Sequence, residues 1–128
     1  MNNNIEPLVI EQTKYTPHVL LDARRSVFEI EGRAMLDEMM AVHNKIMDWL
    51  KQNLSDIDAA IVLIIRLSYL DSAASKMMAE LLGLFDLQYQ AGRQITVNWF
   101  CALNDSEMYA DGEVYASMFK LPIKIHSV

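Results

Sequence analysis

The residues with the clearest chemical potential are the hydroxyl side chains that follow the most apolar stretch of the chain. Residues 63–78 read LIIRLSYLDSAASKMM, an apolar run that stops at Asp71 and gives way to small residues and then to a helical pattern. This order predicts a strand that runs into a helix, with Ser72 at the junction. A serine there can cap the helix through its side-chain oxygen, or it can accept a phosphate.

Both roles for Ser72 have a physical basis, and the residues alone leave them open. A cap at Ser72 would contribute about 1 kcal/mol, although Asp71 beside it is equally able to cap the helix. A phosphate would meet free backbone N–H groups and the positive end of the helix dipole, and Lys76 one turn further on could pair with it. It would also add roughly −1.5 to −2 charge units at an exposed junction. Ser68 is the alternative acceptor, expected to be less accessible because it precedes the end of the strand.

Other chemistry has little support in these residues. A glycine-rich phosphate loop, a nucleophile elbow and metal-ligand spacing are missing from the sequence. His43 falls on an apolar helix face, where a partly buried, hydrogen-bonded histidine is the more frequent outcome. Cys101, the one cysteine, reads as a small semi-buried apolar residue. We therefore expect no enzyme, no metal and no cofactor; a small enzyme using His43 or Cys101 is the alternative from a different class.

Composition narrows the possible partners and the compartment. The chain has 128 residues, of which 52% are hydrophobic, enough for one domain over residues 1–128 with its own core. Residues 1–7 are expected to be flexible. The net charge of −6 argues against binding to nucleic acid or to anionic membrane surfaces, and the short apolar runs argue against direct membrane insertion. A lone cysteine, no visible signal peptide and no apolar run of bilayer length favour the cytoplasm.

Methionines and acidic residues form two further groups. Methionine on a helix face usually fills the core, but methionine-rich surfaces can also repack against partners. Four methionines are candidates for such a protein-binding surface: Met35, Met39, Met40 and Met47. Four acidic residues are expected to form a solvated helix face whose first members complement the helix dipole: Asp105, Glu107, Asp111 and Glu113.

The hydrophobic pattern predicts the elements that position Ser72. Short apolar runs indicate strands at residues 8–10, 19–21, 26–31, 59–65, 94–100 and 121–125. A period near 3.6 indicates helices at residues 34–54, 73–90 and 104–119. Phe28 and Ile30 are expected to face the core, and Asn104 is the expected N-cap of the last helix, with Glu107 in a capping box. The unbroken run 59–65 is typical of a strand covered on both faces.

This order of elements predicts an α/β fold. Three strands precede three helix–strand units, so an antiparallel N-terminal meander should be followed by βα crossovers. Such crossovers are right-handed almost without exception. The expected result is a mixed β-sheet with about three helices.

Several short motifs occur together along most of the chain, from Tyr15 to Ile125. They are Tyr15-Thr16-Pro17, Glu29-Ile30-Glu31-Gly32, Asp48-Trp49-Leu50, residues 67–76, Val97-Asn98-Trp99-Phe100 and Leu121-Pro122. The ordered set resembles the SiaC family of bacterial regulatory phosphoproteins. The resemblance implies a STAS-like fold, similar to that of the anti-sigma factor antagonists.

The resemblance also implies a function, namely partner switching without catalysis. In this family a serine/threonine kinase phosphorylates a hydroxyl in the strand-to-helix motif, and a PP2C-type phosphatase removes the phosphate. The unphosphorylated protein binds and activates a diguanylate cyclase, which raises cyclic di-GMP and favours aggregation and biofilm. The alternative is a STAS-type anti-sigma factor antagonist that sequesters an anti-sigma factor kinase.

The family motif Tyr-Phe/Leu-Asn-Thr-Ser-Ser-x-Lys implies a role for each residue at the junction. Ser72 stands at the place of the phosphorylated threonine and Asp71 at the place of the asparagine. An aspartate beside the acceptor could disfavour a phosphate or partly mimic one. Ser72 is thus the implied phosphorylation site, with Ser68 as the alternative. The residues expected to surround the phosphate or to contact partners are Tyr69, Leu70, Asp71, Ser75 and Lys76.

Overall fold

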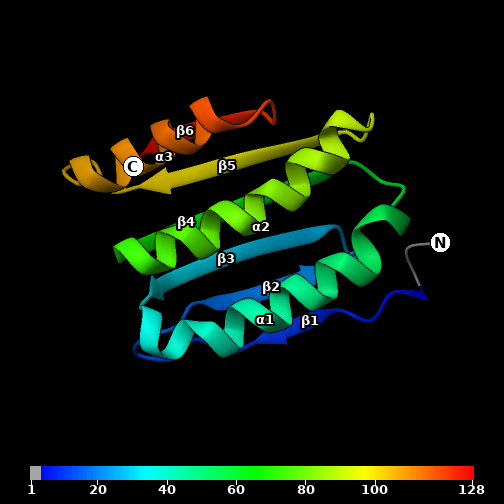
Figure 1. Ribbon diagram of the computed structural model, residues 1–128, viewed down its shortest axis with the longest axis horizontal. Helices are drawn as coiled ribbons and strands as arrows, with labels where there is room; N and C mark the ends of the chain where they lie inside the picture. The colour runs from blue at the N-terminus through cyan, green and yellow to red at the C-terminus, as the bar shows by residue number, and fades with distance from the viewer. Residues whose placement is uncertain (1–3) are drawn as a thin grey trace.

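The protein is a six-stranded mixed sheet with three α-helices (Figure 1). The structure, a computed structural model, describes residues 4–128 apart from the side chains of Leu36 and Asp37. The elements are β1 (Leu8–Ile10), β2 (His18–Asp22), β3 (Val27–Ala34), α1 (Leu36–Asn53), the short 3-10 turn η2 (Leu54–Asp56), β4 (Ile61–Leu70), α2 (Ser72–Gln90), β5 (Ile95–Cys101), α3 (Ser106–Met118) and β6 (Ile123–Ser127). In the described part of the chain no helix is both long enough and apolar enough to cross a membrane.

The strand pairing confirms the predicted meander and crossovers. The β1–β2 and β2–β3 pairs are antiparallel, whereas β3–β4, β4–β5 and β5–β6 are parallel. The strands lie in the sheet in the order in which they occur in the chain. Each parallel pair is joined by one helix, and each step advances to the next strand in the same direction. Crossovers of one hand therefore place every helix on the same face, as Figure 1 shows for α1, α2 and α3.

The core lies between this face of the sheet and the helices. The inward residues of the central strands, among them Leu63, Ile65 and Trp99, are fully buried. Phe28 and Ile30 also face the core, as the alternation in β3 predicts. Such burial is the main stabilising term, at about 25 cal/mol per Å² of apolar surface.

The prediction that the apolar run is covered on both faces is wrong. In β4, Leu63 is buried while Val62 is 46% exposed, so the strand alternates like one half of a two-layer sandwich. All helices cover one face, and among residues 4–128 the other face carries no helix. The strand continues past the apolar run to Leu70, directly before the junction, as the sequence predicts, with Arg66 and Ser68 on the open face.

The sequence predicts a flexible segment over residues 1–7, and residues 1–3 lie outside the described part of the chain. Ile5 is buried and belongs to the core. The indole Nε1 of Trp49, on α1, donates a hydrogen bond of 2.7 Å to the carbonyl of Glu6. These contacts hold Ile5 in the core and Glu6 against α1.

Candidate phosphorylation site at the start of helix α2

Ser72 is the first residue of α2, and its neighbour Asp71 is the N-cap. The carboxylate Oδ1 of Asp71 accepts a hydrogen bond of 2.7 Å from the N–H of Ala74. The carbonyl of Asp71 accepts the first helical bond, 2.9 Å from the N–H of Ser75. The capping role that the residues left open between Ser72 and Asp71 therefore falls to Asp71.

This cap leaves the Ser72 hydroxyl without a structural task. The side chain is exposed, and in the described residues no hydrogen bond involves its hydroxyl. The first N–H groups of a helix have no intrahelical acceptor, and here the carboxylate of Asp71 pairs with that of Ala74. The N–H groups of Ser72 and Ala73 therefore remain to meet a phosphate at the positive end of the helix dipole.

The first turn of α2 is held in place from α3. The hydroxyl of Ser75 donates to the carbonyl of Ser72 at 2.7 Å, so Ser75 is engaged within the turn. The phenol of Tyr115, on α3, donates a hydrogen bond of 2.8 Å to the carbonyl of Ser75. Burial, and to a smaller extent the charge of Asp111, raise the pKa of Tyr115 to about 12. The phenol thus stays protonated and keeps donating at physiological pH.

The strand side of the junction divides into structural and exposed residues. Leu70 is half-buried and packs against the core. The N–H of Asp71 donates to the carbonyl of Ala34 at 3.3 Å, which ties the junction to the end of β3. Tyr69 is exposed, and the guanidinium of Arg33 lies 5.3 Å from its ring centroid. Of the strand residues expected to contact partners, Tyr69 is therefore the accessible one.

The alternative acceptor, Ser68, is also exposed. It lies where the pairing of β3 with β4 shifts in register between Gly32 and Arg33. Its hydroxyl donates a long bond of 3.4 Å to the carbonyl of Gly32. Because side chains alternate along a strand and Leu67 points into the core, Ser68 belongs to the open face of the sheet.

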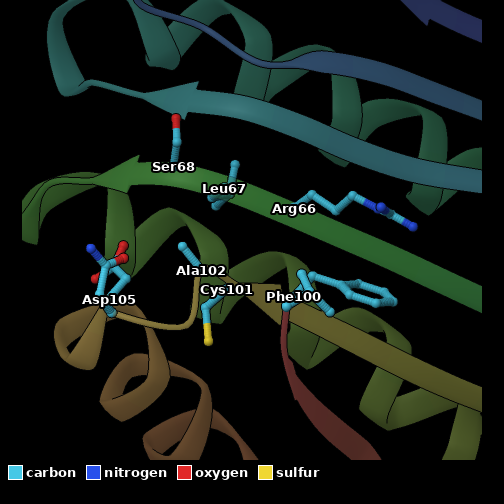
Figure 2. Close-up of a pocket in the computed structure, with 9 residues that line it drawn as sticks. Arg66, Leu67, Ser68, Phe100, Cys101, Ala102 and Asp105 are labelled. Carbon is cyan, nitrogen blue, oxygen red and sulfur yellow. The ribbon is translucent and has the colours of Figure 1, made fainter.

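Ser68 lines a pocket of about 490 Å³ at the carboxyl ends of β4 and β5 (Figure 2). On its floor the guanidinium of Arg66 stacks at 4.3 Å over the ring of Phe100. The ring of His126 lies on β6 and stacks on Phe100 at 4.7 Å between centroids. This pocket carries the cation of Arg66 and the ring of Phe100, and Ser72 is not among the residues that line it.

The start of α3 has the same capping hydrogen bond as the start of α2, although the backbone of its N-cap residue is less extended. Its first residue is the exposed Ser106, and its N-cap is Asp105, whose Oδ1 accepts from the N–H of Met108 at 3.0 Å. The sequence predicts Asn104 as the cap, so the prediction is wrong by one residue. Two Asp-Ser pairs in this chain therefore begin helices in the same way.

The two helix starts differ in charge. The first turn of α2 holds no acidic residue, and exposed Lys76 lies one turn after Ser72. The first turn of α3 holds Glu107, and Asp111 follows. Partial burial, and then the charges of Glu107 and of the capping aspartate, raise the pKa of Asp111 above its usual range. A phosphate on Ser72 would therefore lie near a basic side chain, whereas one on Ser106 would lie near acidic side chains.

The other candidate residues do not form a catalytic group. His43 is 6% exposed; its Nε2 lies 3.5 Å from Glu80 Oε2, and its Nδ1 has no hydrogen-bond partner in the described structure. The expected burial is confirmed, but only one ring nitrogen has a partner. Cys101 is buried, with its sulfur 3.7 Å from Ser127 Oγ. Within residues 4–128 no cluster of His, Cys, Asp or Glu side chains could hold a metal ion.

The fold and the junction define a small α/β domain in which an exposed hydroxyl begins a helix behind a parallel strand. The family model described as SiaC family regulatory phosphoprotein matches residues 10–128. The chain therefore belongs to the SiaC family, as the sequence motifs predict.

Known proteins similar to this chain come from Pseudomonas aeruginosa. An uncharacterized protein of strain UCBPP-PA14 is 26% identical over 92 residues, which cover 72% of this chain and 73% of that protein. The crystal structure of apo-SiaC is 22% identical, with a TM-score of 0.85, and the match covers 95% of this chain and 99% of SiaC. SiaC in complex with the diguanylate cyclase SiaD, which it activates, is 22% identical with a TM-score of 0.87, over 94% of this chain and 99% of that one. These likenesses confirm the predicted fold.

Proposed function

We propose that this chain is a phosphorylation-switched adaptor whose unphosphorylated form binds and activates a diguanylate cyclase. The observation that carries the proposal is the exposed hydroxyl of Ser72, which begins a helix that Asp71 already caps. Membership of a family of regulatory phosphoproteins supports the phosphate. The complex of SiaC with the cyclase SiaD, in P. aeruginosa, supports the class of partner.

In this proposal the chain carries no catalytic residue, metal or cofactor of its own. A serine/threonine kinase adds the phosphate to Ser72 in the cytoplasm, and a PP2C-type phosphatase removes it. The phosphate brings roughly −1.5 to −2 charge units, which the N–H groups of the first turn and Lys76 partly compensate. The surface that the cyclase meets therefore differs in charge between the two forms. The unphosphorylated form binds the cyclase and raises cyclic di-GMP, and phosphorylation lowers it.

Asp71 places a negative charge beside the proposed phosphorylation site. Its carboxylate already accepts from the first turn of α2, so a phosphate on Ser72 shares the helix terminus with a second negative group. An asparagine can form the same cap without the charge. We infer that Asp71 raises the energy of the phosphorylated state and so favours the form that binds the cyclase.

Purification of the chain from its native cells, with mapping of phosphorylated peptides and identification of bound proteins, tests the proposal. We expect phosphate on the peptide that contains Ser72, and a diguanylate cyclase bound to the unphosphorylated fraction. Phosphate found only at Ser68 or elsewhere would overturn the assignment of Ser72. Recovery of an anti-sigma factor kinase in place of a cyclase would favour the anti-sigma factor antagonist instead.

A further inference from the structure

A groove of about 420 Å³ opens between α1 and α2 on the outer surface of the helical layer. The two helices pack side by side over the sheet, as Figure 1 shows. Along α1 the groove extends from Met40 to Lys51. Eleven residue steps at 1.5 Å each correspond to about 16 Å, or roughly three turns of a helix.

Methionines supply the apolar lining of this α1–α2 groove. Met40 is 55% exposed at its rim, Met47 is half-buried, and Met77 is buried at its base. Methionine side chains have several rotatable bonds and a polarisable sulfur, so they adapt to the shape of a partner. Of the four methionines that the sequence marks for a protein-binding surface, Met40 and Met47 thus lie in the groove, whereas Met39 belongs to the core.

A buried polar atom in the groove has no hydrogen-bond partner. His43 lines the groove at 6% exposure, and its Nδ1 has no partner among the residues that the structure describes. Its Nε2 faces the carboxylate of Glu80 at 3.5 Å. A ring with one proton that donates through Nε2 accepts through Nδ1, so the missing partner is a hydrogen-bond donor. Leaving a buried polar group unpaired costs free energy, and a partner molecule that pairs with it gains this energy.

The groove begins where the proposed switch lies. Lys76 lines it and follows Ser72 by one helical turn. The lining holds as many acidic as basic side chains, namely Asp48 and Glu80 with Lys51 and Lys76. A phosphate on Ser72 would pair with Lys76 and give this end of the groove a net negative charge.

We propose that the α1–α2 groove is the docking site of the cyclase, through an amphipathic helix of about three turns. The apolar side of that helix lies on Met40, Met47 and Met77, and a donor on it pairs with His43 Nδ1. A carboxylate of the cyclase lies beside Lys76. Phosphate on Ser72 takes Lys76 away from this carboxylate and repels it, so the same lysine couples the modification to the interface. The inference rests on the proposed function and names its binding surface.

Isothermal titration of the unphosphorylated full chain with the purified cyclase tests the groove. Met40→Glu adds a charge at the exposed rim and should weaken binding by about tenfold or more. Leu87→Glu is the matched control, because Leu87 is exposed on α2 and does not line the groove. It should bind within about twofold of the wild type. Equal affinities for the Met40 and Leu87 variants, with both folded, would overturn the groove.

His43→Leu separates a binding role from a structural one. Loss of the unpaired nitrogen should leave the melting temperature unchanged or higher, while affinity for the cyclase falls by about fivefold. A fall in both the melting temperature and the affinity, or in neither of them, would contradict the role of His43 in docking.

The wild-type titration separates the two proposals. If the wild-type chain fails to bind the cyclase, the proposed function fails. If it binds, and phosphate on Ser72 weakens binding while Met40→Glu does not, only the groove is wrong.

Discussion

Helices α2 and α3 begin with the same pair of residues and the same capping hydrogen bond, yet only one of them has the surroundings of a switch. Asp71 and Asp105 each cap a helix whose first residue is an exposed serine. Behind Ser72 lie Lys76 and the α1–α2 groove, whereas behind Ser106 lie acidic side chains. A helix terminus is therefore a common anion-binding geometry, and the charges and the surface next to it decide whether a phosphate there can control a partner.

The largest expected effect comes from Asp86, which links α2 to the segment that follows α3. Asp86 on α2 is buried, and its Oδ1 accepts from the N–H groups of Lys120 and Leu121, at 3.0 and 2.9 Å, just after α3. Asp86→Ala leaves both donors without a partner and should lower the free energy of unfolding by about 3 kcal/mol in urea denaturation. Asp86→Asn keeps an acceptor oxygen and should lose less; equal losses would contradict this account of the anchor.

The next test concerns how α3 is seated on the sheet. A Cβ at Gly112 would lie 2.6 Å from Trp99 Cδ1, whereas one at Gly83, on α2, would come no closer than 3.9 Å to a neighbour. Gly112→Ala should therefore destabilise by about 1–3 kcal/mol through overpacking. Gly83→Ala should stabilise by about 0.5–1 kcal/mol, because alanine is the better helix former. Thermal unfolding of both variants shows whether the signs are opposite, and a stabilising Gly112→Ala would refute the close contact.

Removal of the caps tests whether the two helix starts are equivalent. Asp71→Ala and Asp105→Ala should each cost about 1 kcal/mol of stability, and similar losses would confirm that the local structures match. The matched pair Asp71→Asn and Asp105→Asn should cost only a few tenths of a kcal/mol, because asparagine also caps. With the charge removed, Asp71→Asn should in addition raise the fraction of Ser72 that carries phosphate at the steady state set by the kinase and the phosphatase. An unchanged fraction would show that Asp71 does not oppose the modification.

The smallest effect at neutral pH belongs to Tyr115, which ties the start of α2 to α3. Its pKa is raised to about 12 in the folded chain, against about 10 for an unfolded tyrosine. Between these values the folded state keeps a proton that the unfolded state loses, so stability is full below about pH 10 and falls as the pH rises towards 12. Tyr115→Phe removes this part of the slope. Denaturation curves across the alkaline range that are identical for both proteins would contradict the raised pKa.

The periodicity of the sequence predicts the helices and strands, because the residues of each element that face the core are spaced at the period of a strand or of a helix. The mixed sheet, Phe28 and Ile30 in the core, and the family follow from such local patterns. Local patterns do not show whether helices cover one face of β4 or both, because an apolar run such as residues 61–65 is compatible with either arrangement. The hand and direction of three crossovers, which are properties of the whole sheet, decide that question.

The candidate site was predictable in place but not in detail. Adjacent residues that can both cap, such as Asp71 with Ser72, differ only in backbone angles that the sequence does not display. Tyr115 bonds to Ser75 across 40 positions, and Asp86 to Leu121 across 35, so no spacing rule indicates either contact. The unpaired Nδ1 of His43 likewise depends on how two helices pack side by side.

The most direct test of the central claim compares phosphate at the two equivalent serines. Phosphoserine is encoded at position 72 in one protein and at position 106 in another, and each is titrated into the cyclase beside the unmodified chain. Phosphate at Ser72 should weaken binding by about tenfold or more, and phosphate at Ser106 should leave it within about twofold. If phosphoserine at position 72 binds the cyclase as tightly as the unmodified chain does, Ser72 is not the switch.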